Sequence, residues 1–127
     1  MHKSQLAGFI IDCNGDDLDA AADFWSGALG LKRNAADTPA TGSYVHLEKK
    51  DPNGLHIEVQ KVSHESRVHI DIESDDIEAE VARLEKLGAK RLKKIETWWV
   101  MEAPTGQRFC VVCAKRGNFA TEANVWK

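Results

Sequence analysis

The sequence lacks any apolar run long enough to cross a membrane. A spanning helix needs about 20 consecutive apolar residues, and every apolar run in this sequence is far shorter. The beginning of the chain has no apolar signal core after Lys3, so no secretory leader is expected. These absences favour a cytoplasmic protein with no membrane partner.

Cysteine is scarce, and neither sign of charge is in large excess. Three cysteines without a framework spacing argue against a secreted disulfide scaffold. Seventeen basic and 20 acidic residues give a net charge of −3. The one basic cluster, Lys90 to Lys94, is expected to be a solvated strand edge. We therefore expect no nucleic-acid partner.

The overall composition is typical of one globular domain, with 127 residues of which 43% are hydrophobic and 29% charged. The most regular stretch begins at Val68. From Val68 to Glu73 apolar and polar residues alternate, which predicts a strand with one apolar and one polar face. After Ser74 the apolar residues recur at helical spacing as far as Gly88. This helix is expected to cover the apolar strand face, including Val68 and Ile70.

The same pattern of strand and helix occurs upstream, between Gly8 and Gly30. The segments that follow also match, with Asp51 to Val59 corresponding to Ala103 to Val111. We therefore predict an α+β fold of two tandem β-α-β-β-β modules that form a half-open, barrel-like cleft. The single domain spans 1–127, with module one at about 5–62, module two at about 67–114 and a C-terminal tail at 115–127.

The spacing of apolar and polar residues along the chain predicts the individual strands and helices. Strands are expected at 6–13, 31–34, 43–49, 55–62, 68–73, 91–95, 97–101 and 107–113, and helices at 16–29 and 77–87. The loop at 35–42 either lines a site or is a disordered connector. The tail is expected to be a frayed terminus, and the alternative is that Phe119 and Trp126 dock it on the domain or on a partner subunit.

The polar strand faces hold the candidate site. Both helices need the apolar faces, so the polar faces point the other way and line a shared cleft if the halves lie side by side. The predicted ligand-binding residues on these faces are Asp12, His56, Gln60, Trp98, Arg108 and Cys110. Trp99 points away from Trp98 and is expected to pack under a helix.

Glu58, His69 and Asp71 are the predicted catalytic residues. His69 and Asp71 lie two residues apart on one strand face, which places them roughly 6 to 7 Å apart. That spacing lets them share one ligand, with His69 as general acid or base. The alternative is a hydrogen-bonded cleft histidine without a catalytic role.

Two of the cysteines have the spacing of a redox or zinc motif, but an interval of three in a strand sends Cys110 and Cys113 to opposite faces. Cys113 and Cys13 are therefore expected in the core. Cys110 is either a reactive thiol beside Arg108 or a buried, inert one.

Three segments carry a family resemblance: Ala22 to Leu31, Val68 to Ala89, and Trp98 to Val112. Through them the chain resembles the vicinal oxygen chelate superfamily, the glyoxalase and bleomycin-resistance-like fold, and especially its small glyoxalase-like members. The resemblance covers Leu6 to Val112. It implies the fold predicted above but leaves the function open, since this superfamily includes lyases, dioxygenases, epimerases, thiol transferases and non-catalytic drug binders.

The resemblance also implies where a divalent metal, such as Zn, Ni, Mn or Fe, would bind. The four corresponding positions hold Ile10, Glu58, His69 and Cys110. Glu58 and His69 fit the pattern, whereas Ile10 cannot bind a metal and Cys110 stands where glutamate is usual. Cys110, Gln60 or Asp12 would have to complete the set. The missing ligand favours a metal-free site, and no organic cofactor is indicated.

Two functions from different classes follow from the resemblance. One is a lyase-like or dioxygenase-like enzyme with a small-molecule substrate. The alternative is a protein that sequesters a planar or aromatic compound against Trp98 without catalysis. Members of this superfamily are usually dimers, so a homodimer is expected.

Overall fold

The protein is described by a computed structural model that covers residues 1–38 and 42–127. The chain forms two compact units. The first-module unit is Phe9–Val68, and the second-module unit combines Met1–Gly8 with His69–Lys127. Among the described residues no helix is both long and apolar enough to span a bilayer. Positions 39–41 of the predicted loop lie outside the described residues.

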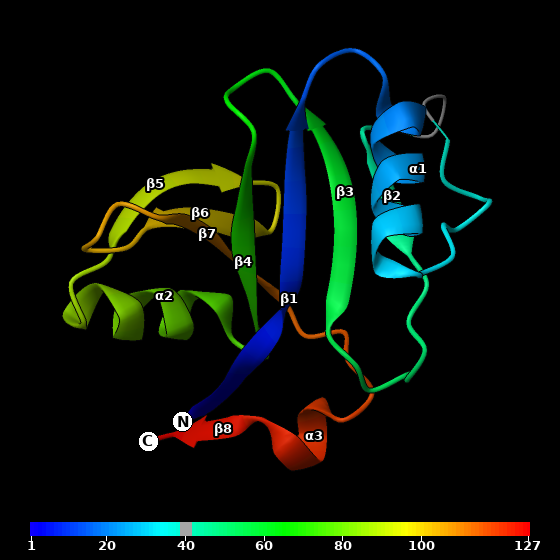
Figure 1. The fold of residues 1–127 in the computed structure, drawn as a ribbon. Coiled ribbons are helices and arrows are strands. Elements are labelled where there is room, and N and C mark those ends of the chain that lie inside the picture. The colour runs from blue at the N-terminus through cyan, green and yellow to red at the C-terminus, as the bar shows by residue number, and fades with distance from the viewer. Residues whose placement is uncertain (39–41) are drawn as a thin grey trace. The chain divides into compact units, whose positions relative to one another are not determined.

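The first-module unit contains the end of strand β1 (His2–Asn14), helix α1 (Leu18–Leu29) and strands β2 (Tyr44–Leu47) and β3 (His56–Val62). Its strands lie in the order β2-β3-β1 (Figure 1). Helix α1 begins where the Asp17 side chain accepts a hydrogen bond from Ala20 N, and it ends at Gly30, whose φ of 67° is left-handed. Both ends therefore follow from the capping residues in the sequence.

The core of this unit lies between α1 and the hairpin of β2 and β3. Its buried residues are Leu18, Ala22, Val45, Leu47 and Val59. Because side chains alternate along a strand, the residues between these hydrophobic ones lie on the hairpin face away from α1. The predicted strand at 31–34 is reduced to a single bridge between Arg33 and Leu47.

The second-module unit contains strand β4 (Arg67–Ser74) from His69 onward, helix α2 (Ile77–Lys86) and strands β5 (Lys90–Ile95), β6 (Trp98–Glu102) and β7 (Arg108–Cys113). Its strands run in the order β1-β4-β7-β6-β5, with β7 parallel to β4. The core beneath α2 consists of Val81, Leu84, Met101 and Val111. The fold prediction of α+β β-α-β-β-β modules is therefore confirmed at the level of the elements.

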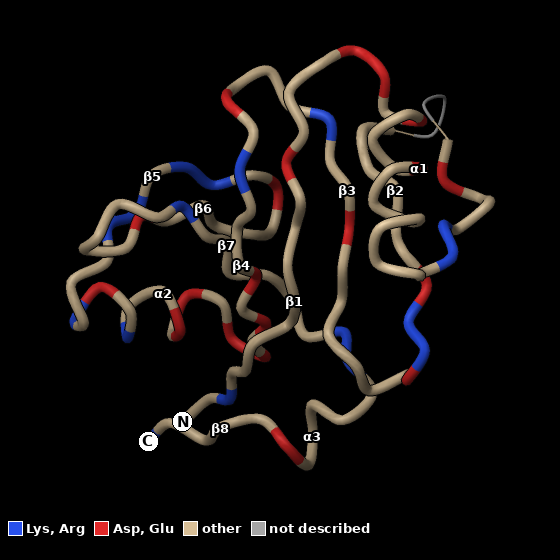
Figure 2. The backbone as a smooth tube through the Cα atoms, viewed as in Figure 1, with Lys and Arg blue, Asp and Glu red and all other residues tan. Residues whose placement is uncertain are grey.

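Basic residues lie along β5, which is the edge strand in this strand order (Figure 2). Lys90, Lys93 and Lys94 are exposed, and Arg91 forms ion pairs with Glu78 and Glu85, both at 2.9 Å. The cluster is thus the solvated strand edge that the sequence predicts.

The prediction that α2 covers the whole apolar face of β4 is wrong. Val68 and Ile70 are 58% and 44% exposed, and only Ile72 packs against the core under α2. The helix packs mainly on β6 and β7, through Met101 and Val111. Within the second-module unit, Ile70 therefore lies outside the core that the helix covers.

The frayed tail is also a wrong prediction. The tail forms helix α3 (Phe119–Glu122) and strand β8 (Asn124–Trp126), which pairs antiparallel with the beginning of β1. Glu73, which is only 1% exposed, accepts a hydrogen bond from Lys115 N at 3.2 Å and from Gln5 Nε2 at 2.8 Å. A buried carboxylate thus holds the start of the tail.

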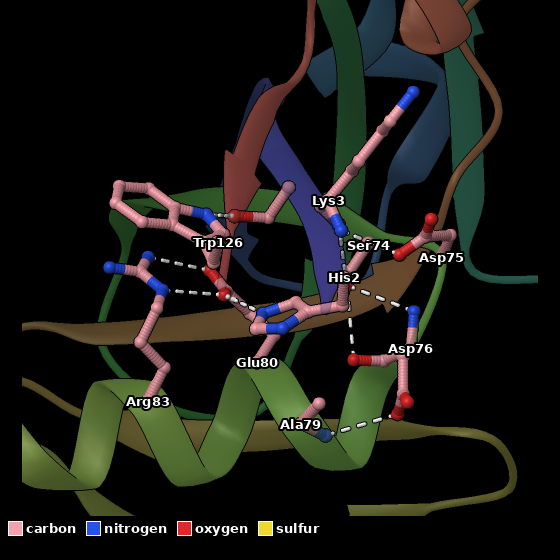
Figure 3. Close-up of polar contacts among 10 residues, drawn as sticks. His2, Lys3, Ser74, Asp75, Asp76, Ala79, Glu80, Arg83 and Trp126 are labelled. Carbon is pink, nitrogen blue, oxygen red and sulfur yellow. Dashed lines mark hydrogen bonds and ion pairs between the residues drawn. The ribbon is translucent and has the colours of Figure 1, made fainter.

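A second buried carboxylate, that of Glu80, holds the end of the C-terminal tail, as Figure 3 shows. Glu80 on α2 accepts hydrogen bonds from Arg83 and lies 2.8 Å from His2 Nε2. The Arg83 guanidinium lies 3.8 Å from the ring centre of Trp126, and Trp126 Nε1 donates to Ser4 Oγ at 2.8 Å. These contacts fix the last strand on the first.

Candidate functional site

The first-module unit brings together a set of polar side chains that we call the hairpin group: Asp37, His46, His56 and Glu58. His46 on β2 is directly opposite Glu58 on β3, and His56 lies two residues before Glu58 on the same strand face. His46 Nε2 is 2.7 Å from Glu58 Oε1, and His56 Nε2 forms a hydrogen bond with the same oxygen. Two imidazoles therefore converge on one carboxylate oxygen.

Asp37 extends the hairpin group to a fourth residue. Its Oδ2 accepts hydrogen bonds from His46 N at 2.8 Å and from His46 Nδ1 at 2.7 Å. Since an ionised carboxylate can only accept, the Nδ1 of His46 carries a proton. Asn34 positions this part of the chain by accepting from Ala36 N at 3.0 Å through its side chain.

The hairpin group is strongly polarised. Burial alone would raise the pKa of Glu58, but the hydrogen bonds from His46 and His56 outweigh it and lower the pKa to about 2. The bond to Glu58 raises the pKa of His46 to about 9, against the opposing effect of burial. At neutral pH the group therefore holds an ionised carboxylate beside an imidazolium.

Two further predicted residues lie in this unit but outside the hairpin group. Gln60 lies opposite Tyr44 in the hairpin register and shares the strand face of Glu58. Asp12, at the end of β1, is 3% exposed and its Oδ2 is 3.9 Å from Arg67 Nε. Asp12 does not belong to the cluster of His46, His56 and Glu58.

The second-module unit holds a second set, which we call the strand group: His69, Asp71, Cys110 and Trp98. Asp71 on β4 is directly opposite Cys110 on β7. His69 Nε2 lies 3.5 Å from Asp71 Oδ1. The two side chains lean toward each other, so their polar atoms are closer than the 6 to 7 Å expected from the spacing along the strand.

One atom of the strand group has an unsatisfied hydrogen-bonding capacity. Asp71 Oδ1 is buried and accepts no hydrogen bond from any residue in the described part of the chain. Buried carboxylate oxygens nearly always have a donor. A small side-chain movement of His69, whose Nε2 lies 3.5 Å away, would supply a hydrogen bond to this atom.

Trp98 and Arg108 share a strand face with Cys110. Val100 is directly opposite Cys110, and Trp98 lies two residues before Val100 on the same face. Trp99 points the other way and packs against the core under α2, as predicted. Its Nε1 donates a hydrogen bond to Glu78 at 2.8 Å. Arg108 Nε lies 3.3 Å from Glu102 Oε2, with which it forms an ion pair.

The cysteine predictions have mixed outcomes. Cys13 packs against the core of the first-module unit as expected, and burial raises the pKa of its thiol. Cys113 is exposed, so its expected place in the core is wrong. Cys113 is the last residue of β7, and this strand contributes only Phe109 and Val111 to the described core beneath α2.

The sequence did not single out His46 or Asp37 as site residues. The alternation of β2 placed His46 on the polar strand face, and this was the available signal. Nothing in the local pattern around Asp37 indicated its contact with His46, because that contact depends on the path of the loop after Asn34.

The metal set implied by the resemblance does not fit this chain. The Ile10 side chain is a hydrocarbon and is 2% exposed, so it supplies no ligand atom. Glu58 uses its Oε1 within the hairpin group, while His69 clusters with Asp71 and Cys110. The pairing of Glu58 with His69 as metal ligands stays a prediction.

Comparison with known proteins shows the class. The sequence matches the glyoxalase-like domain family model over residues 8–112. The chain therefore belongs to the glyoxalase-like domain family, and its membership of the glyoxalase, bleomycin-resistance and vicinal oxygen chelate superfamily is confirmed. No curated protein matches the sequence.

Solved structures show the same fold at low sequence identity. A hypothetical protein from Bacillus halodurans is 16% identical with a TM-score of 0.61, over 90% of this chain and 97% of that one. Methylmalonyl-CoA epimerase in complex with methylmalonyl-CoA is 14% identical with a TM-score of 0.55, over 90% and 97%. The Streptomyces coelicolor methylmalonyl-CoA epimerase is 14% identical with a TM-score of 0.54, over 88% and 96%. At these identities the likeness shows the fold alone.

Proposed function

We propose that the protein is a lyase-like enzyme that moves a proton on a small carbonyl compound, with His69 as acid and base and Asp71 as its orienting carboxylate. The observation that carries this proposal is the pair itself. His69 Nε2 lies 3.5 Å from Asp71 Oδ1, and the two side chains are only 14% and 13% exposed. An imidazole beside a carboxylate is a common arrangement for general acid-base catalysis near neutral pH.

The proposed reaction needs only one proton carrier. The His69 imidazole removes a proton from the carbon next to the substrate carbonyl, which leaves an enolate and an imidazolium. Asp71 stabilises the imidazolium through its negative charge. The imidazolium then delivers the proton to a different carbon of the conjugated enolate, or gives it to a leaving group that departs as the enolate collapses. The first outcome is an isomerisation and the second a lyase reaction.

The strand group offers a surface for the rest of the substrate. Trp98 is half-buried and shares the strand face of Cys110, so its indole can stack on a planar part of a ligand. Two of the structural neighbours are epimerases whose structures contain acyl-CoA compounds. Acyl thioesters therefore belong among the carbonyl compounds to be tested, together with aldehydes and 2-oxo acids.

Exchange of carbon-bound hydrogen with solvent tests the proposal without knowledge of the product. The full chain is incubated in D2O with each class of carbonyl compound, and loss of the C–H signal is followed by NMR. We expect exchange with at least one class and a loss of at least about 100-fold in His69→Gln. Asp71→Asn should lower the exchange rate at saturating substrate by a larger factor than it raises the substrate concentration needed for half-saturation.

The matched control is His64→Gln, because His64 is an exposed histidine outside both groups. It should exchange at the wild-type rate. Equal rates in wild type and His69→Gln would contradict the proposal, as would the absence of exchange with every class of compound.

The second candidate function is binding without catalysis, and the half-buried Trp98 on the polar strand face favours it. In that case planar aromatic compounds should quench Trp fluorescence, and Trp98→Ala should lose binding while His69→Gln keeps it. Trp99→Phe is the control, since Trp99 packs under α2.

A homodimer, a cytoplasmic location and a dioxygenase-like reaction stay predictions.

A further inference from the structure

We infer that the hairpin group is a metal site, in which His46 Nε2, His56 Nε2 and one oxygen of Glu58 bind a divalent transition-metal ion such as Zn²⁺ or Fe²⁺. This site goes beyond the proposed reaction, whose residues lie in the second-module unit. It also differs from the set that the family resemblance implies, with which it shares only Glu58.

The ligand atoms are already gathered. His46, His56 and Glu58 each offer one ligand atom, and these atoms lie within 4.8 Å of one another. Zinc binds imidazole nitrogen and carboxylate oxygen at about 2.0 to 2.1 Å, so ligand atoms around a tetrahedral ion lie about 3.3 Å apart. The 2.7 Å between His46 Nε2 and Glu58 Oε1 would have to increase by only about half an ångström.

The contact between Asp37 and His46 is the arrangement typical of a metal-binding histidine. Such a histidine usually donates its second ring nitrogen to a carboxylate, which fixes the tautomer and aims the other nitrogen at the ion. Here the Nδ1 of His46 lies 2.7 Å from Asp37 Oδ2, and its Nε2 points to Glu58. In the metal-free protein, protons bridge the nitrogens to Glu58, and an entering cation would displace them to solvent.

The hairpin holds these ligands on a rigid base with one open side. On the face toward α1, Val45 and Val59 are fully buried and Leu47 is 3% exposed, so the backbone of both strands is fixed by packing. The His46 side chain is 44% exposed, which gives an ion a path from solvent. Two imidazoles and a carboxylate leave further coordination positions for water or a ligand.

Titration of the metal-free full chain with Zn²⁺ and Co²⁺ tests the site. Calorimetry gives the stoichiometry, and the visible absorption of Co²⁺ reports its coordination. We expect one ion per chain in wild type. His46→Gln and His56→Gln should each weaken binding by at least about 100-fold, and Asp37→Asn by about 10 to 100-fold, since it removes an orienting partner instead of a ligand.

Three control variants make the test specific. His64→Gln should bind the ion as wild type does. His69→Gln and Cys110→Ser should also bind it normally, and near-UV circular dichroism of every metal-free variant confirms that it is folded. The absence of stoichiometric binding would overturn the inference. Binding that is lost in His69→Gln but kept in folded His46→Gln would also overturn it and assign the ion to the strand group.

Discussion

His46 and Glu58 face each other across the hairpin of the first-module unit, with His46 Nε2 2.7 Å from Glu58 Oε1. The contact joins the centre of β2 to the centre of β3 on the face opposite the hydrophobic core. His56 and Asp37 extend it on either side. A small hairpin thus carries a chain of four hydrogen-bonded ionisable groups.

The first prediction concerns the stability of this hairpin. In metal-free protein, Glu58→Gln should lower the free energy of unfolding by about 2 kcal/mol, because hydrogen bonds to a charged group contribute about 1.5 to 3 kcal/mol. Urea unfolding with a chelator present measures the change. Glu48→Gln is the control, because Glu48 is exposed and should change stability by less than about 0.5 kcal/mol. Equal effects of the two variants would contradict a stabilising role for the contact.

The elements were predictable because their signals are local. Asp17 and Asp76 cap the two helices through their side chains, and Gly30 ends the first one. The alternation of apolar and polar residues is enough to place Glu58 and His69 on the polar strand faces. These patterns depend on neighbours in the sequence, so one sequence is enough to read them.

The contacts between elements were less predictable. His46 meets Glu58 only because the turn after Lys50 sets the register of β2 on β3, and Asp37 reaches His46 only through the path of its loop. Ile70 is exposed because the position of α2 leaves this part of β4 uncovered. The strand register and the position of the helix result from tertiary packing. The spacing of apolar residues within one segment carries no information about that packing.

The second prediction concerns the docked tail. Trp126→Ala removes the stacking of Arg83 on the indole, 3.8 Å from the ring centre, and the hydrogen bond to Ser4. The loss should be about 2 kcal/mol in the free energy of unfolding, measured by urea unfolding. Val125→Ala is the matched control, since Val125 is 49% exposed. If both variants kept wild-type stability, β8 would contribute nothing to the fold.

The third prediction is a dependence of stability on pH through Glu80. Burial would raise the pKa of this carboxyl, but hydrogen bonds from Arg83, His2 and Ser4 outweigh it and lower the pKa below its ordinary value of 4.5. A group with a lowered pKa in the folded state stabilises the protein above its unfolded pKa. This contribution is therefore present above about pH 4.5 and is lost as the pH falls through the lower folded value.

Glu80→Gln isolates that contribution. The variant should be less stable than wild type by about 2 kcal/mol at pH 6, and the difference should shrink as the pH falls below 4.5. Urea unfolding between pH 3 and pH 6 measures it. Glu122→Gln is the control, because Glu122 is exposed on α3. A difference that stays constant over this range would show that the charge of Glu80 does not stabilise the fold.

The last prediction ranks the three thiols by their reaction with a disulfide reagent at pH 8. Cys113 is exposed, whereas Cys13 and Cys110 are half-buried, and burial raises the pKa of Cys13. The thiolate is the reactive form, so Cys113 should react first and Cys13 last, about tenfold or more slowly. Cys113→Ser should abolish the fast phase, and Cys110→Ser should leave it intact. The reverse result would identify Cys110 as the reactive thiol, despite the ion pair that occupies Arg108 with Glu102.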